Sequence, residues 1–183
     1  FTRHEPLGVV AIITPFNSPL NILSVSLAPC LAVGNTVVVK PSEHTSASTI
    51  AFAELVKAAG FPDGVFNVVT GAGAGAGQSL ISHSGISKVA FTGGSDTGRR
   101  IAASVGDSLT QANLELGGKS PHIIFADADL DRAVNGAVAG VFASGGQTCV
   151  AGSRIFVEES IYEKTLEQLK ASALDVVVGH PEE

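Results

Sequence analysis

The sequence predicts an α/β fold built around a buried parallel sheet. Hydrophobic residues make up 45% of the 183 residues and charged residues only 15%, which allows a sizeable core and excludes a disordered polyelectrolyte. Short apolar runs alternate with helical patterns along the chain, as in repeated βα units. Connections long enough to contain a helix enforce parallel strands, and unbroken apolar runs are typical of strands covered on both faces.

The expected strands and helices follow one another in order. Strand–helix pairs are expected at residues 9–14 with 20–33, 36–40 with 46–59, 65–70 with 78–82 and 88–92 with 96–104, and a further strand at 111–116. Gly34 and Gly60 stand where helix ends favour a positive φ. The hydroxyl and carboxylate side chains of residues 42–46 are suited to begin the second helix.

After Gly117-Gly118 the pattern starts again. Strands at 121–125 and 154–158 and helices at 130–142 and 162–173 are expected. We therefore predict a domain of residues 1–117 and the beginning of a second α/β domain at 118–183. The chain starts on a phenylalanine and contains no methionine, so we expect it to be an internal segment of a longer protein.

Composition narrows the class of partner. The net charge is −6 and the basic residues are scattered, so neither nucleic acid nor an anionic membrane is expected to bind. No apolar stretch approaches the roughly 20 residues of a membrane span. Cys30 and Cys149 lack ligand spacing, as do the histidines, so no metal site is expected, and so few cysteines are typical of a cytoplasmic protein. A small-molecule partner is favoured.

Alternating glycines and alanines fill residues 71–77, between an expected strand and a helix. Gly71, Gly73 and Ala76 satisfy the pattern G-x-G-x-x-G/A, whose backbone amides can approach a pyrophosphate at a helix N-terminus. A flexible Gly/Ala turn would satisfy the same pattern by chance. A second strand–glycine–helix junction at residues 91–98 strengthens the case for a cofactor.

Lys40 and Glu43 follow the second expected strand, at the edge where open α/β sheets bind ligands. A carboxylate there can accept both hydroxyls of an adenosine ribose and would repel a 2′-phosphate, which favours NAD over NADP. The alternative is a solvated Lys/Glu pair at a helix start.

Cys149 lies in a turn of small residues, 145–152, whereas Cys30 lies in an apolar helical run. The turn should expose the Cys149 thiol and let a substrate come close, while Cys30 suits a buried position. An exposed cysteine can serve as a nucleophile, although spacing alone does not establish that role for Cys149.

Two further polar residues follow expected strands. Glu115 precedes Gly117-Gly118, where burial would raise its pKa toward the working range of a base; alternatively it pairs with Lys119 or Arg154. Asn17 lies between two prolines, where it is either a turn residue or an amide donor to an oxyanion.

Taken together, several motifs resemble the aldehyde dehydrogenase superfamily in order and spacing. They are Pro15-Phe16-Asn17, Lys40-Pro41-Ser42-Glu43, Phe91-Thr92-Gly93, the stretch 115–121 that starts Glu-Leu-Gly-Gly-Lys, and Gly146-Gln147-Thr148-Cys149 with 151–154. The resemblance covers nearly the whole chain but well under half of a typical family member.

The resemblance implies a Rossmann-like parallel sheet with helices on both faces, followed by the start of a catalytic domain. It makes Cys149 the nucleophile, Glu115 the base that activates the hydrolytic water, and Asn17 an oxyanion donor. It implies NAD as cofactor and a homodimer or homotetramer that oxidises an aldehyde. The implied cofactor contacts are Lys40, Ser42, Glu43, Gly73, Gly77, Phe91, Gly93, Gly94, Ser95, Gly98 and Leu116.

The sequence departs from the common family pattern at Gly94, where a serine often contacts the pyrophosphate, and at Phe16, where tryptophan is frequent. The later motif that fixes the nicotinamide ribose lies outside the chain, so we expect the 183 residues alone to be inactive. Two alternatives remain: a CoA-acylating member of the superfamily, in which a glutamate at the position of Glu115 is generally absent, and a non-catalytic cofactor-binding fragment of the same fold.

Overall fold

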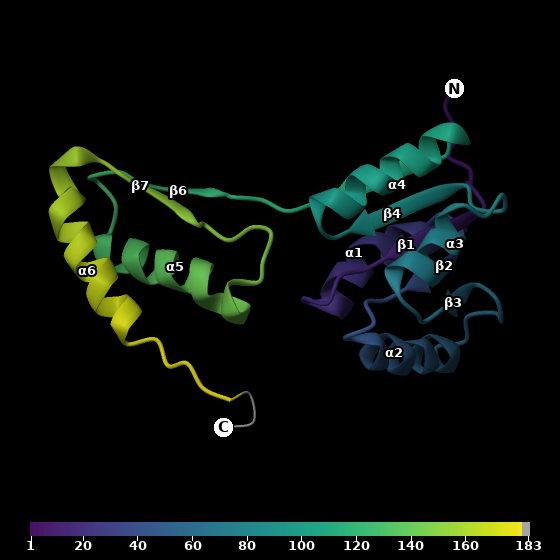
Figure 1. Cartoon of the computed structure of the whole chain (residues 1–183), viewed down its shortest axis with the longest axis horizontal. Helices are drawn as coiled ribbons and strands as arrows, with labels where there is room; N and C mark the ends of the chain where they lie inside the picture. The colour runs from purple at the N-terminus through teal and green to yellow at the C-terminus, as the bar shows by residue number, and fades with distance from the viewer. Residues whose placement is uncertain (181–183) are drawn as a thin grey trace. The chain divides into compact units, whose positions relative to one another are not determined.

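The computed structural model describes residues 1–180 of the chain. The chain forms two compact units, Phe1–Gly117 and Gly118–Glu183 (Figure 1). Each unit has its own sheet. None of the helices within residues 1–180 combines the length and the apolar character that a membrane crossing requires.

The first unit contains a parallel sheet of five strands in the order β3-β2-β1-β4-β5 (Figure 1). The strands are β1 (Val9–Ile13), β2 (Thr36–Lys40), β3 (Phe66–Val68), β4 (Lys88–Thr92) and β5 (Gln111–Glu115). The chain runs outward from β1 to β3 and then returns to the other side of β1 with β4. The strand order therefore reverses between β1 and β4, the place where open α/β sheets bind ligands at the carboxyl ends of their strands.

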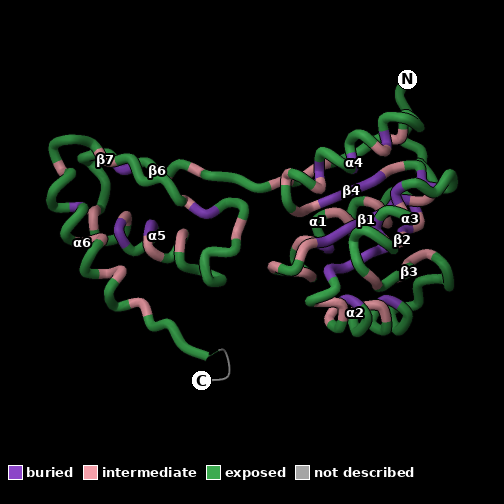
Figure 2. The backbone as a smooth tube through the Cα atoms, viewed as in Figure 1, coloured by how far each residue is buried: buried purple, intermediate pink, exposed green. Residues whose placement is uncertain are grey.

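Helices cover both faces of this sheet, as the sequence predicts. Ala11 and Ile13 of β1 belong to a core cluster that includes residues of α3 (Gln78–Ile81) and α4 (Ser95–Asp107). Val10 and Ile12 belong to a second cluster, which includes residues of α1 (Pro19–Ala32). A side chain of α2 (Ser46–Ala58) packs against this cluster. Alternate side chains of a strand point to opposite faces, so β1 is buried on both sides (Figure 2). The predicted α/β class is confirmed.

Most expected bounds agree with the structure to within one or two residues. Gly34 and Gly60 have φ values of 86° and 87°, which confirms their role at helix ends. The third strand, β3, is an edge strand that pairs only with β2 and is shorter than expected, with three residues. A π-helical turn, η1 (Gly73–Gly77), precedes α3, and α4 continues to Asp107.

The expectation that side chains of residues 42–46 cap α2 is wrong. Thr45 precedes the helix without a capping hydrogen bond, whereas the Ser46 hydroxyl donates to the Ser42 carbonyl oxygen at 2.9 Å. The polar groups of residues 42–46 therefore form hydrogen bonds with one another. They do not bind the backbone N–H groups that lack a partner in the first turn of α2.

The second unit begins with β6 (Pro121–Ile124), which pairs in parallel with β7 (Arg154–Val157). Between these strands lie α5 (Leu130–Phe142) and the short turn η2 (Ala143–Gly146), and after them η3 (Glu159–Ile161) and α6 (Tyr162–Leu174). Asp129 caps α5 by accepting a hydrogen bond from the Arg132 amide at 3.2 Å. Buried Val134, Ala137 and Thr165 lie on the two helices.

Candidate functional site

A cavity of about 190 Å³ lies in the first unit at the carboxyl ends of three strands. Ile13 of β1, Lys40 of β2 and Phe91 of β4 contribute to its wall. Residues of η1 and α3 line a second part, and α4 contributes Thr97, Arg100 and Ile101. The cavity therefore lies beside the reversal of strand order, where a ligand is expected in this architecture.

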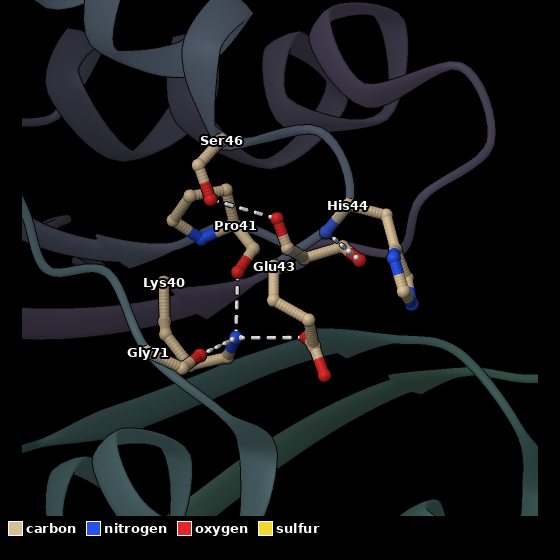
Figure 3. A network of polar contacts seen from close by, with 7 residues as sticks. Lys40, Pro41, Glu43, His44, Ser46 and Gly71 are labelled. Carbon is tan, nitrogen blue, oxygen red and sulfur yellow. Dashed lines mark hydrogen bonds and ion pairs between the residues drawn. The ribbon is translucent and has the colours of Figure 1, made fainter.

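Lys40 is buried, with only 3% of its surface exposed. Its Nζ donates to the carbonyl oxygens of Pro41 at 2.6 Å and Gly71 at 3.0 Å, and lies 3.9 Å from Glu43 Oε2 (Figure 3). Burial lowers the pKa of the Lys40 ammonium below its usual value, and the Glu43 carboxylate opposes this shift. The alternative of a solvated Lys/Glu pair is wrong for Lys40.

Glu43 differs from Lys40 because about half of its side chain, 52%, is exposed. A hydrogen bond from its own backbone N–H lowers the pKa of the Glu43 carboxyl most, while partial desolvation raises it and nearby Lys40 and His44 lower it. The buried Ser42 accepts a hydrogen bond from the His44 amide at 3.3 Å. This segment therefore presents a charged carboxylate next to a buried cation.

The glycine turn packs directly on Lys40. A Cβ built at Gly77 would lie 3.4 Å from Lys40 Cδ, so Gly77 lies in close contact with the lysine stem. A Cβ at Gly73 would meet no atom within 4 Å. The turn therefore combines one glycine packed against the site with one that leaves its backbone open to a ligand.

The junction between β4 and α4 also depends on glycine. A Cβ at Gly93 would lie 2.5 Å from the ring of the buried Phe91, and a Cβ at Gly98 would lie 2.5 Å from Leu116 Cδ2. Leu116 is thus packed on α4 at Gly98. Gly94 precedes the helix and has open space where a side chain would be, and Ser95 is the first helical residue.

The candidate base and oxyanion donor both belong to the first unit. Asn17 is half-buried in the turn before α1, where the next residue, Ser18, has a φ of 48°. Glu115 ends β5 and is exposed. The burial that would raise the pKa of a base is therefore absent from this unit, in which most residues of β5 are exposed.

Cys149 lies in the second unit and is exposed, as its turn of small residues predicts. Ser144, Gly145 and Gly146 have φ values of 55°, 62° and 74°, so the chain leaves α5 through three left-handed residues in succession. Such a run is costly for a residue with a side chain. These residues lie between the end of α5 and the exposed Cys149.

Gly118 lies against this turn. A Cβ built on Gly118 would lie 2.5 Å from the Cys149 carbonyl oxygen, a backbone atom that has no freedom to rotate away. Arg154 reinforces the same contact region, because its Nε donates to the Lys119 carbonyl oxygen at 2.8 Å. The segment that follows Gly117 therefore supports the backbone of the cysteine turn.

We predict that Gly118→Ala displaces this turn. Overpacking against a backbone atom should lower the free energy of unfolding of the intact protein by about 1–3 kcal/mol and change the alkylation rate of Cys149. Gly136→Ala is the matched control, since a Cβ there meets open space within α5 and should stabilise the helix by about 0.5–1 kcal/mol. Unaltered stability and alkylation in Gly118→Ala would show that the contact does not constrain the cysteine.

The structure gathers some of the expected cofactor residues and separates others. One cavity is lined by Lys40, Gly73, Gly77 and Phe91. Leu116, which follows β5, instead packs on Gly98 of α4. Several lining residues belong to no motif and were not predicted from the sequence: Gln78, Thr97, Arg100 and Ile101. Helical spacing could have predicted three of them. Positions 97, 100 and 101 share one face of α4, immediately after the glycine junction that precedes this helix.

Among residues 1–180, no three or more histidine, cysteine, aspartate and glutamate side chains are grouped so that they could hold a metal ion.

Comparison with known sequences finds similarity over the whole chain. The profile of the aldehyde dehydrogenase family matches residues 1–183. A hydroxyisobutyraldehyde dehydrogenase of Mycolicibacterium austroafricanum is 55% identical over 181 residues, which cover 99% of this chain and 36% of that protein. Human retinal dehydrogenase 2 is 53% identical over 182 residues, or 99% of this chain and 35% of the relative. The chain thus spans about a third of the length of these relatives.

Solved structures show the same similarity. An NAD-dependent aldehyde dehydrogenase from Sinorhizobium meliloti superposes with a TM-score of 0.94 at 47% identity, over 97% of this chain and 35% of that one. PnpE, solved in complex with nicotinamide adenine dinucleotide, gives a TM-score of 0.93 at 47% identity, over 97% of this chain and 36% of that one.

Proposed function

Because the chain belongs to the aldehyde dehydrogenase family, we propose that the protein carrying it oxidises an aldehyde to a carboxylic acid, with NAD as hydride acceptor. The observation that carries this proposal is the exposed Cys149 in its left-handed turn. A strained turn that presents a thiol to solvent suits a nucleophile rather than a packing residue. The second unit would then be the beginning of a catalytic domain, and the first unit a cofactor domain.

The residues in and beside the cavity of the first unit suit parts of the cofactor. Lys40 and Glu43 would hold the hydroxyls of the adenosine ribose, because a charged carboxylate accepts such hydrogen bonds and the buried ammonium donates them. The backbone at Gly73 and Gly94, each with open space beside it, would approach the pyrophosphate. NAD, when bound, supplies the acceptor for the hydride.

The protein's own residues account for the remaining chemistry. The Cys149 thiolate adds to the aldehyde carbon, and a C–S bond forms while the carbonyl oxygen becomes an oxyanion. The Asn17 amide and the Cys149 backbone N–H would donate hydrogen bonds to that oxyanion. Loss of hydride from the same carbon leaves a thioester. Glu115 then takes a proton from water, which attacks the thioester, and the Cys149 thiolate departs as the acid is released.

The test is a screen of the intact protein with aliphatic and aromatic aldehydes, in which NADH and carboxylic acid are measured with and without CoA. One acid per NADH, unaffected by CoA, is the expected result. Formation of acyl-CoA in place of the acid would assign the protein to the CoA-acylating reaction instead. Failure to form NADH with any aldehyde would count against an oxidative role.

We predict that Glu43 makes the intact protein prefer NAD over NADP by about tenfold or more in kcat/KM, since a second negative group beside its carboxylate is repelled. Glu43→Ser should lower that ratio, chiefly by raising kcat/KM for NADP. Glu54→Ser, which removes another exposed carboxylate from α2, should leave the ratio unchanged. Equal kcat/KM values for NAD and NADP in the unmutated protein would show that Glu43 does not discriminate between the two cofactors.

We also propose a cytoplasmic location and a homodimer or homotetramer for the intact protein. The location is supported by the free thiols of Cys30 and Cys149, which suit a reducing compartment. The assembly rests on family membership, and a measured molar mass in solution would test it.

A further inference from the structure

We propose that Arg154 is a positioning residue for the proposed nucleophile. Its guanidinium fastens the beginning of β7 to residues 118–120, the segment that lies against the backbone of Cys149. This inference rests on the proposed function. It assigns a role to a residue outside the reacting groups, because Arg154 acts through the main chain.

Cys149 occupies a central position of a β-turn. The Ala151 amide donates to the Thr148 carbonyl oxygen at 3.3 Å, so Cys149 and Val150 are the residues that the turn encloses. The hydrogen bond of such a turn does not use the N–H of the enclosed residues. The thiol and the proposed backbone donor to the oxyanion belong to the same residue, so both move when the turn moves.

The main chain alone holds this turn loosely. The ladder between β6 and β7 begins at Pro121 and Arg154 (Figure 1), so the turn lies beyond its end. The Arg154 amide donates to the Ser120 carbonyl oxygen at 3.4 Å, which is long for an N–H···O hydrogen bond. Close packing of Gly118 on the Cys149 carbonyl oxygen stops the turn from moving closer to this segment. It does not stop the turn from moving away.

The Arg154 side chain supplies the shorter link. Its Nε donates to the Lys119 carbonyl oxygen at 2.8 Å, and a charged donor makes a stronger hydrogen bond than a neutral one. Its Cζ lies 5.6 Å from the centre of the Phe156 ring. A planar guanidinium can donate in its own plane while one face rests on a ring, which an ammonium cannot do. The aromatic contact therefore orients the donor toward the segment that precedes β6.

The experiment compares variants of the intact protein in the burst of NADH formation. Arg154→Ala should slow the burst by about tenfold to hundredfold, because a small displacement of a reacting group can cost that much, and should leave KM for NAD unchanged. Arg154→Lys keeps the charge without the planar donor and should recover little of the rate. Arg132→Ala is the matched control, since it removes an exposed arginine of α5 in the same unit, and should keep the full rate.

Hydrogen exchange of the backbone amides gives a second measurement, which does not depend on activity. Exchange should become faster in Arg154→Ala at residues 118–122 and 148–154, while the rest of the second unit exchanges as before. Either an unchanged burst or unchanged exchange in Arg154→Ala would overturn the inference, as would full recovery by Arg154→Lys.

Faster exchange throughout the second unit would also overturn the inference, since Arg154 would then stabilise the unit as a whole. Absence of NADH formation by the unmutated protein with every aldehyde would instead overturn the proposed function. Exchange at residues 148–154 would still decide in that case whether Arg154 holds the turn.

Discussion

Replacing Cys149 with alanine is expected to abolish NADH formation by the intact protein, whereas replacing Cys30 should leave the rate nearly unchanged. The two thiols differ in their surroundings. Cys149 is exposed in a turn of small residues, and Cys30 is half-buried in α1 against the core. Burial raises the pKa of the Cys30 thiol, although Lys88 nearby lowers it, so the buried group tends to remain protonated and unreactive.

The assay follows NADH and iodoacetamide inactivation together. Cys149→Ala should lose turnover and also sensitivity to the reagent, because the covalent intermediate can no longer form. Cys30→Ala should keep both and lower the free energy of unfolding by about 1 kcal/mol through a small cavity. Turnover that survives in Cys149→Ala would refute the thioester mechanism.

Glu115→Gln is expected to give the second largest loss, about 10²-fold to 10⁴-fold in steady-state turnover, the usual contribution of a general base. The loss should be confined to hydrolysis. A rapid burst of about one NADH per active site should therefore remain, followed by slow turnover, because the thioester accumulates when water is not activated.

Rapid-quench measurements with mass analysis of Cys149 would detect that thioester. Glu54→Gln serves as control, since it removes an exposed carboxylate from α2 and should keep full turnover. An unaltered steady-state rate in Glu115→Gln would show that another group acts as the base. Loss of the NADH burst would instead show that Glu115 is needed at or before the loss of hydride.

The sheet could be predicted because its signal is local. Residues 9–13 and 37–39 are apolar without a break, and a strand buried on both faces requires such a run. The positive φ of Gly34 and Gly60 was likewise predictable from the end of each helical pattern. The length of β3 was not, because the first and last residues that pair with β2 do not differ in character from the apolar residues beside them.

The environment of the site residues was harder to predict, since burial depends on elements distant in sequence. Lys40 is buried because the turn at Gly71 and Gly77 packs on it, and a lysine after a strand is otherwise expected in solvent. Glu115 was expected to be buried but lies on an edge strand. Arg100 was not predicted to line the cavity, because a single arginine on a helix belongs to no motif. Only the folded cavity identifies it as a lining residue.

The central position of β1 sets the order in which this sheet can be assembled. Its pairing with β2 needs only the residues up to position 40, but its other edge pairs with β4, which ends at Thr92. During synthesis an apolar strand edge therefore stays open while the intervening segments emerge, and such an edge can pair with another chain. Sequence-distant pairing also slows folding. The same topology that creates the ligand crevice thus leaves one edge of β1 without its partner until β4 has been synthesised.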